Sequence, residues 1–160
     1  MAVEFWRYAL LPSKEPRDSW SIIFLDSEWV MSVVSDHGNW AYRWPKQDNF
    51  KAFLCQCDGN YVARKLGGST CWVFDPDRTS QEARKWICSE RRRRDMDKEA
   101  AREEYDRALN IGDGYTWTHF LDETEIPDAW EFGCRSLEPG LKHWTEVSFP
   151  RLQELLRKEL

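Results

Sequence analysis

Cysteine and histidine side chains are the first candidates for chemistry in this sequence, because both bind metals and take part in catalysis. Cys55 and Cys57 form a Cys-x-Cys pair, and Cys71 and His37 are further residues that could join a metal site. Structural zinc sites usually pair cysteines about two to four residues apart and need a second such pair. The sequence has no second pair, which favours small, partly buried thiols. We therefore expect no metal and no cofactor.

Three histidines, His37, His119 and His143, are the candidates for a general base. No Gly-x-Ser-x-Gly or His-Glu-x-x-His motif accompanies them. A catalytic Cys–His pair meets in space and not in sequence, so an enzyme of unrecognised type that uses Cys55 or Cys57 is an alternative. The pattern favours histidines with roles in packing and turns, and we expect a protein that is not an enzyme.

Two glycine-containing segments have residue types found in phosphate-binding loops. Gly67-Gly68-Ser69-Thr70 lacks the lysine that a P-loop requires after its second glycine. Gly112-Asp113-Gly114 is explained as a loop between helices. We interpret both segments as helix ends and turns.

The four consecutive arginines Arg91–Arg94 are the most distinctive charge feature. Successive residues of a helix are about 100° apart, so the four side chains cannot all face one partner. No apolar residue lies between Cys88 and Met96, so this part of a helix has no stripe to bury and must protrude, cross solvent or contact a partner. The predicted partner-binding residues of this charged helix are Arg91, Arg92, Arg93, Arg94 and Lys98.

Two interpretations of the arginine run stay open. In the first, the helix is solvated and carries i,i+4 ion pairs, each contributing about 0.2–0.5 kcal/mol. In the second, the arginines contact nucleic-acid phosphates or an acidic protein surface. The ion pairs expected in the first case are Glu90–Arg94, Arg91–Asp95 and Arg93–Asp97.

The last third of the chain is acidic. From Asp113 to Glu146 there are eight carboxylates and two basic residues, interleaved with Trp117, Trp130 and Trp144. The carboxylates do not follow the spacing of a calcium-binding loop. Acidic and aromatic side chains together could imitate nucleic acid, but tryptophans that pack inward under an acidic surface are the favoured explanation. The predicted partner-binding residues here are Asp113, Asp122, Glu123, Glu125, Asp128 and Glu131. A further alternative is a homodimer in which this surface receives Arg91–Arg94 of a second copy.

These residues need elements to position them, and the first third of the chain predicts an antiparallel sheet. One segment rich in aromatic and β-branched residues precedes a loop marked by Pro12 and Pro16, and three more follow it with starts about 8–12 residues apart. They are residues 3–8, 20–25, 29–34 and 40–44, with another strand at 71–74. Trp40, Tyr42 and Trp44 alternate and share one face, which a helix containing Phe50 is expected to cover.

Helical spacing predicts the remaining elements. Two short helices cover residues 49–54 and 61–66, and a long helix capped by Ser80 runs towards Leu109 over about 30 residues and about 45 Å. Shorter helices follow at residues 116–123, 128–132 and 149–160. The predicted fold is α+β: an N-terminal antiparallel sheet of four to five strands packed by short helices, a long charged helix and a helical C-terminal part. We expect one domain, residues 1–160, with a sheet-rich part (1–78) and a helical part (79–160).

Composition limits the classes of function. Ten tryptophans and a mean hydropathy of -0.73 indicate a core of few, large side chains under a charged surface. The net charge of -5 gives no general attraction to nucleic acid. The sequence shows no signal peptide and no apolar run of about 20 residues, so we expect a cytoplasmic protein with reduced cysteines and no membrane partner.

Five segments, in this order, resemble a family of small proteins encoded by tailed phages and prophages. They are FWRYAL, SDHGNWAYRW, FKAFL with YVARKLGG, FLDETEIPDAWEF and FPRLQELLRKEL, and they are distributed over most of the chain. The resemblance implies a phage source and the cytoplasm of a bacterial host cell, and it transfers no catalytic residue.

Accessory phage proteins of this size commonly act on host machinery or counter host defence. We therefore expect a non-enzymatic accessory protein that binds a host protein or complex, such as an anti-CRISPR-like or other inhibitor of a bacterial defence complex. The alternative is an accessory protein that binds nucleic acid through Arg91–Arg94.

Overall fold

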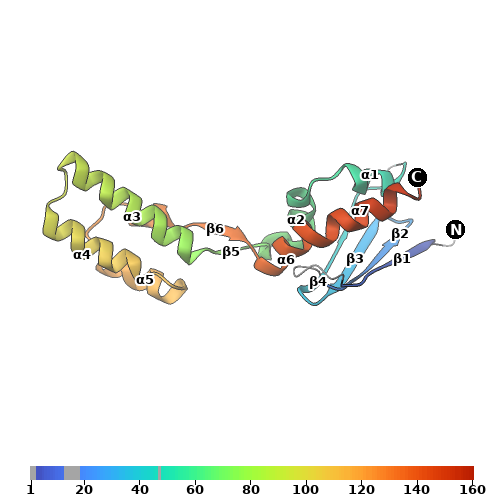
Figure 1. Ribbon diagram of the computed structural model, residues 1–160, viewed down its shortest axis with the longest axis horizontal. Coiled ribbons are helices and arrows are strands. Elements are labelled where there is room, and N and C mark those ends of the chain that lie inside the picture. The colour runs from blue at the N-terminus through green and yellow to red at the C-terminus, as the bar shows by residue number, and fades with distance from the viewer. Residues whose placement is uncertain (1–2, 13–18, 47) are drawn as a thin grey trace. The chain divides into compact units, whose positions relative to one another are not determined.

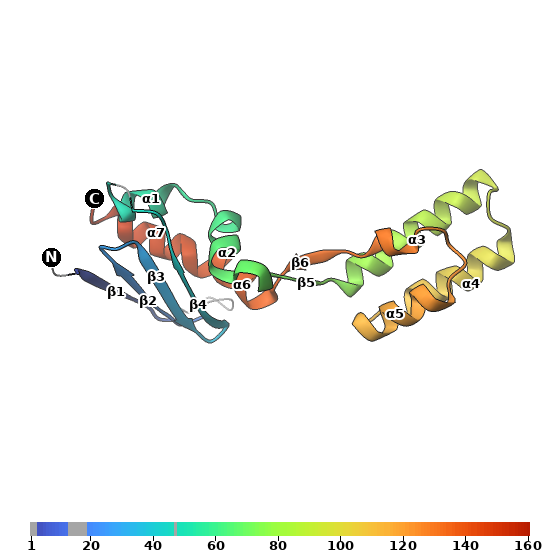
Figure 2. The same cartoon turned by 180° about the vertical axis from the view of Figure 1, so that it is seen from behind.

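The computed structural model describes residues 3–12, 19–46 and 48–160. The chain forms two compact units, which Figures 1 and 2 show as ribbons. Unit 1 comprises Met1–Cys71 and Leu137–Leu160, and unit 2 comprises Trp72–Ser136. The single domain of 1–160 stays a prediction, but residues 137–160, which we assigned to the helical part, belong with the sheet.

Unit 1 contains a four-stranded antiparallel sheet in which each strand pairs with the next along the chain. Its strands are β1 (Phe5–Leu10), β2 (Ser21–Asp26), β3 (Val30–Ser35) and β4 (Gly38–Arg43). The register pairs Tyr8 with Ile23 and Val33 with Trp40. This sheet and the α+β class are confirmed. The loop predicted around Pro16 lies outside the described residues.

Helices cover one face of this sheet. They are α1 (Phe50–Gln56), α2 (Gly59–Gly67), α6 (Pro139–His143) and α7 (Phe149–Arg157), with a π-helical turn, η3 (Trp144–Ser148), leading into α7. Figure 2 shows the sheet in front and α7 behind it. Strand residues such as Ile23 and Met31 are fully buried together with Leu54 and Trp144, and form one core.

The alternating aromatic residues of β4 and the segment after it are part of this core. Trp44 is buried, and its ring centroid lies 5.6 Å from that of Phe50 on α1. Trp40 and Tyr42 are partly buried against the same cluster. Trp44 therefore packs against the helix that contains Phe50, as expected, whereas the ring of Trp40 lies 6.1 Å from that of Trp144 in η3.

Unit 2 is mainly helical. It contains α3 (Pro76–Arg93), α4 (Lys98–Leu109), α5 (Gly114–Glu123) and the short 3-10 helix η2 (Ala129–Phe132). The strand predicted at 71–74 is β5 (Trp72–Phe74), but it pairs with β6 (Arg135–Leu137) and not with the four-stranded sheet. A further 3-10 turn, η1 (Gly68–Thr70), follows α2 in unit 1.

The predicted single helix from Ser80 to Leu109 is wrong, because α3 and α4 are separate helices that pack side by side. Asp75 caps α3 by accepting a hydrogen bond from the Arg78 amide, and Pro76 follows at a position that needs no amide donor. Arg94 ends α3 in a left-handed conformation with φ 68°, and Asp97 caps α4.

The hairpin forms because each helix has its own narrow apolar stripe. Ala83 and Ile87 of α3 and Ala101 and Ala108 of α4 are buried in one cluster, which a continuous helix could not bring together. Ser80, the predicted cap, is buried inside this hairpin, where its hydroxyl donates to the Ala108 carbonyl at 2.7 Å.

Candidate functional site

All of the predicted partner-binding residues lie in unit 2, and all of them are exposed. Arg91–Arg94 and Lys98 flank the turn between α3 and α4. Asp113 caps α5, which carries Asp122 and Glu123 near its end, and Glu125, Asp128 and Glu131 follow between α5 and β6. The structure therefore brings both charged groups, which are up to 40 residues apart in the sequence, onto one compact unit.

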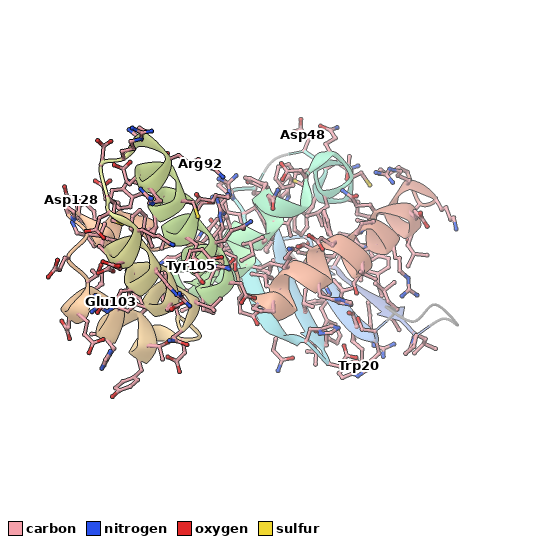
Figure 3. The ribbon with its side chains drawn as sticks, turned by 60° about the vertical axis from the view of Figure 1, so that its left-hand side comes forward. Trp20, Asp48, Arg92, Glu103, Tyr105 and Asp128 are labelled. Atoms are coloured by element: carbon pink, nitrogen blue, oxygen red, sulfur yellow. The ribbon has the colours of Figure 1, made fainter. Side chains whose placement is uncertain are left out.

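The arginine run contributes to a groove between α3 and α4. The groove has a volume of about 340 Å³ and continues into a neighbouring hollow of about 420 Å³, with which it shares Cys88, Arg92 and Tyr105. Figure 3 shows Arg92 on α3 and Tyr105 on α4, whereas Glu103 and Asp128 lie on the other side of the hairpin. We call the combined feature the basic groove. Its lining is Gln81, Arg84, Lys85, Ile87, Cys88, Arg91, Arg92, Lys98, Ala101, Arg102 and Tyr105.

The ion pairs expected within the arginine run do not form. Because the helix ends at Arg93 and Arg94 turns left-handed, the i,i+4 geometry is lost beyond that point. Arg93 instead pairs with Glu90 at 2.6 Å, an i,i+3 pair. Within unit 2, all of which is described, Arg91, Arg92, Lys98 and Arg102 make no ion pair with a carboxylate.

The opposite side of α4 carries a network around a buried carboxylate that the sequence analysis missed. Glu104 is only 4 % exposed. It accepts hydrogen bonds from Arg107 at 2.6 Å, from the Thr124 hydroxyl at 2.6 Å and from the Glu125 amide at 3.3 Å. The signal in the sequence was its position three residues after Ala101 and four before Ala108, on the buried stripe. Glu104 therefore fixes the segment that displays the acidic residues after α5.

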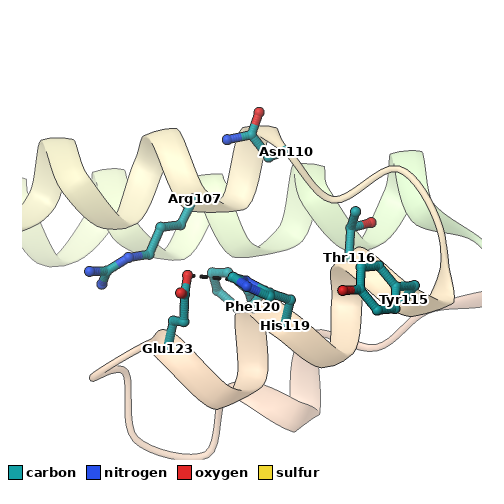
Figure 4. A pocket seen from close by; sticks show the side chains of 7 residues that line it. All are labelled: Arg107, Asn110, Tyr115, Thr116, His119, Phe120 and Glu123. Atoms are coloured by element: carbon teal, nitrogen blue, oxygen red, sulfur yellow. Dashed lines mark ion pairs between the residues drawn. The ribbon is translucent and has the colours of Figure 1, made fainter.

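A separate pocket of about 350 Å³ lies between α4 and α5 (Figure 4). Its lining includes His119, whose Nδ1 lies 3.1 Å from a carboxylate oxygen of Glu123. The hydroxyl of Thr116 also lines it, but this group hydrogen-bonds to Asp113 at 2.9 Å in the cap of α5. The hydrogen bond that the Thr116 amide donates to Asp113 at 2.8 Å, followed by the bond from the Thr116 hydroxyl, holds the pKa of Asp113 below its usual value. The pocket thus combines an oriented imidazole with a hydroxyl already engaged in helix capping.

The other candidates for chemistry lie in unit 1 and have structural contacts. Burial raises the pKa of the Cys57 thiol to about 11, with smaller contributions from Asp58 and Cys55, and burial also raises the pKa of Cys55. Both are therefore protonated near neutral pH, which leaves little of the nucleophilic thiolate. The rings of His37 and His143 lie 4.1 Å apart and join the β3–β4 turn to α6.

The described ranges contain no group of three or more His, Cys, Asp or Glu residues placed to hold a metal ion. The two glycine segments act as helix boundaries: Gly68 ends α2 with φ 55°, and Gly114 begins α5. This is the role that we expected of both.

The three tryptophans of the acidic third differ in their surroundings. Trp144 is fully buried in unit 1, and Trp117 stacks between Phe74 and Phe120 in unit 2. Trp130 is 65 % exposed. The inward-packing interpretation therefore holds for Trp117 and Trp144 and is wrong for Trp130, because the 3-10 helix η2 buries Ala129 instead.

Unit 2 carries both of the charged groups predicted from the sequence, and comparison with known proteins identifies the family of the chain. The family model Phage_phiTE_072, described as a phage family, matches residues 1–158. The chain belongs to this phage family. The match covers both units and confirms the resemblance to phage proteins. No curated protein and no solved structure matches the chain significantly. Among the helices of the described residues, none has the length and apolar character required to span a membrane.

Proposed function

We propose that this phage-family protein acts without catalysis, in the cytoplasm of the bacterial host, by binding a host protein through unit 2. A component of a bacterial defence complex, as for an anti-CRISPR-like inhibitor, is the target class that we favour. The observation that carries the proposal is the row of exposed cations without ion pairs, Arg91, Arg92, Lys98 and Arg102, along the basic groove.

The lack of ion pairs matters because unit 2 has carboxylates in excess. It contains 16 acidic and 11 basic residues, and it pairs Lys85, Arg93 and Arg107 with neighbouring carboxylates. Exposed ion pairs contribute only about 0–1 kcal/mol to stability, so stability alone hardly distinguishes paired from unpaired cations. Cations held apart from carboxylates do, however, create a local positive potential that steers and orients an acidic partner.

Nucleic acid is the second candidate, favoured by the same cations. Against it stands the net charge of unit 2, because 16 carboxylates on so small a unit repel a polyanion at long range. Binding through phosphate contacts would also weaken steeply with salt, which gives a direct test.

Affinity purification of the tagged full-length protein from a bacterial host lysate tests the proposal, with protein mass spectrometry and nucleic-acid extraction on the same eluate. The test variant is Arg91→Ala/Arg92→Ala/Arg93→Ala/Arg94→Ala. The matched control, Arg7→Ala/Arg43→Ala/Lys46→Ala/Arg64→Ala, removes four exposed basic residues of unit 1.

We expect a specific host protein with the wild type and the control, and its loss with the test variant. Recovery of that protein with the test variant would exclude the arginine run as its binding surface. Nucleic acid as the main retained species, lost at high salt, would favour the second candidate.

A further inference from the structure

We infer that the basic groove binds an acidic amphipathic helix of the partner protein, with an apolar side chain on the groove floor and carboxylates against its cationic rim. This inference rests on the proposed function and specifies the chemistry of the segment that is recognised. The floor, the length and the charge of the groove support this inference.

The floor of the groove is apolar. Ile87 and Ala101 are buried beneath it, and Cys88 and Tyr105 are partly exposed along its length. Ala101 has the smallest side chain of this set, so it leaves room between the two helices for a side chain from outside. An apolar hollow of this kind gains stability when an apolar group displaces its water.

The rim of the groove is basic on both sides. The residues of α3 that line it at successive turns are Arg84 and Lys85, then Cys88, and then Arg91 and Arg92. The residues of α4 that line it are Lys98, then Ala101 and Arg102, and then Tyr105. At about 1.5 Å per residue, each wall is about 10 to 12 Å long, which matches roughly two turns of an occupying helix.

The pattern of floor and rim specifies the occupant. A helix with apolar residues at i, i+4 and i+7 presents a stripe to the floor, and acidic residues beside the stripe then lie opposite the rim. Arg91, Arg92 and Arg102 can each bind a carboxylate with two parallel N–H donors. These groups are free to do so, because they make no ion pair within unit 2, which is described throughout.

A nucleic acid fits the groove less well. Its phosphates would satisfy the cations of the rim, but a phosphate backbone offers no apolar side chain to the floor formed by Ile87, Cys88 and Ala101. The acidic surface of the same unit would also repel it. The apolar floor is the observation that separates a protein segment from a nucleic acid.

A second copy of this chain also fits less well, although its acidic residues have the right charge. Phe120 of α5 is buried and Trp117 is partly buried in their own unit, so the one large apolar side chain that α5 exposes is Tyr115, at 78 %, which by itself forms no stripe. The exposed Trp130 lies on η2, whose four residues are shorter than the groove. The chain therefore lacks an exposed acidic helix with an apolar stripe in unit 2, all of which is described.

The test uses the full-length protein and a fluorescein-labelled, hydrocarbon-stapled helix of 14 residues as the probe. The probe carries leucine at positions 4, 8 and 11 and glutamate at the positions beside them, and the staple lies on the opposite face. A second peptide of the same composition has its leucines dispersed around the helix. A labelled 20-base-pair DNA duplex is the third probe, and fluorescence anisotropy is measured in 50 and 200 mM NaCl.

We expect the striped probe to bind at least about tenfold more tightly than the dispersed peptide and the DNA. The variant Arg91→Glu/Arg92→Glu should weaken binding of the striped probe by about tenfold or more, because both charges are reversed. The control variant Arg7→Glu/Arg64→Glu, which reverses two exposed arginines of unit 1, should bind within about twofold of the wild type.

Three results would overturn the inference: equal binding of the striped and dispersed peptides, tighter binding of DNA, or sedimentation as a dimer that the striped probe does not dissociate. Host-protein capture that depends on Arg91–Arg94 but is not displaced by the striped probe would leave the proposed function standing and reject the groove occupant. If the wild type captured no host protein and did not bind the striped probe, the proposed function and this inference would both be rejected.

Discussion

The two units of this protein differ in net charge and in the size of the side chains that they bury. Unit 1 carries 12 basic and 12 acidic residues around a core of large buried side chains such as Trp144, Phe149 and Met31. Unit 2 carries the whole negative excess of the chain, and four of its eight buried apolar residues are alanines. Unit 1 is therefore a scaffold built on large buried side chains. Unit 2 is a charged surface on a small core.

This difference narrows the choice of the proposed binding surface more than any single motif does. The large aromatic residues of the unit 1 core have packing partners, whereas Arg91, Arg92, Lys98 and Arg102 of the basic groove have no ion-pair partner within unit 2, where every residue is described. The variants below test whether the units also differ in how they respond to substitution.

The largest expected effect is in the core of unit 1. Trp144→Ala removes a fully buried side chain whose Nε1 donates to the Ser21 hydroxyl at 3.1 Å. We expect a loss of about 3–5 kcal/mol in the free energy of unfolding, measured by urea denaturation followed by circular dichroism. The control Trp130→Ala, at a tryptophan 65 % exposed in unit 2, should cost less than about 1 kcal/mol. Similar losses for the two variants would contradict the comparison.

A smaller loss is expected at the buried carboxylate of unit 2. Glu104→Ala leaves the Arg107 guanidinium with Glu103 as its remaining carboxylate partner and the Thr124 hydroxyl without its acceptor, and should cost about 2–3 kcal/mol in the free energy of unfolding. Glu103→Ala, which removes an exposed partner of the same arginine, should change it by less than about 1 kcal/mol. Equal effects would show that Glu104 is not the anchor of the segment after α5.

The sequence was sufficient for the part of unit 1 up to Cys71 because the signals there are local, whereas residues 137–160 of the same unit were assigned to the helical part. β-Branched and aromatic residues alternate between turn residues, and the glycines at 67 and 68 end a helix where a left-handed residue is needed. Such patterns depend little on distant parts of the chain. They gave the order of the strands and the helix that covers Trp44.

The sequence was insufficient for unit 2 because two competing signals surround the charged run. The residues from Ser80 to Leu109 favour helix throughout, but only a hairpin buries both Ile87 and Ala108. Asp97, which caps α4, marks the break between the helices. Because polar residues precede it, this part of the sequence is hard to distinguish from the exposed surface of a continuous helix. The site residues were predicted by charge, whereas Tyr105, Ala101 and Cys88 of the groove require the hairpin to be known.

The pH dependence of the stability of unit 1 should be a smaller effect than the losses expected at Trp144 and Glu104. Hydrogen bonds from Lys51 at 2.6 Å and from Tyr8 at 2.8 Å hold the pKa of Glu159 below its ordinary value. A carboxylate whose pKa is lower in the folded state stabilises the fold above its unfolded pKa, and this stabilisation is lost as the pH falls through the folded value. Thermal melts should therefore show the wild type losing its advantage over Glu159→Gln as the pH falls below about 4.5.

Because Glu159 is largely exposed, solvent screening limits this advantage to about 1 kcal/mol or less. Glu154→Gln, at an exposed position of α7, which ends two residues before Glu159, is the control and should follow the wild type across the pH range. A difference between wild type and Glu159→Gln that stays constant with pH would show that the ionised carboxylate is not what stabilises the C-terminal end of the chain.

The smallest expected effect on stability belongs to the residues with the largest expected effect on binding. Replacing Arg91–Arg94 with alanine removes exposed side chains and one surface ion pair, between Arg93 and Glu90. The free energy of unfolding should change by less than about 1 kcal/mol, because alanine favours the helix and offsets the lost pair. A melting temperature that falls as far as that of Trp144→Ala would make the run part of the scaffold, and any loss of partner would then follow from unfolding. An unchanged melting temperature with lost binding would instead assign the cations to recognition, since unit 2 folds without them.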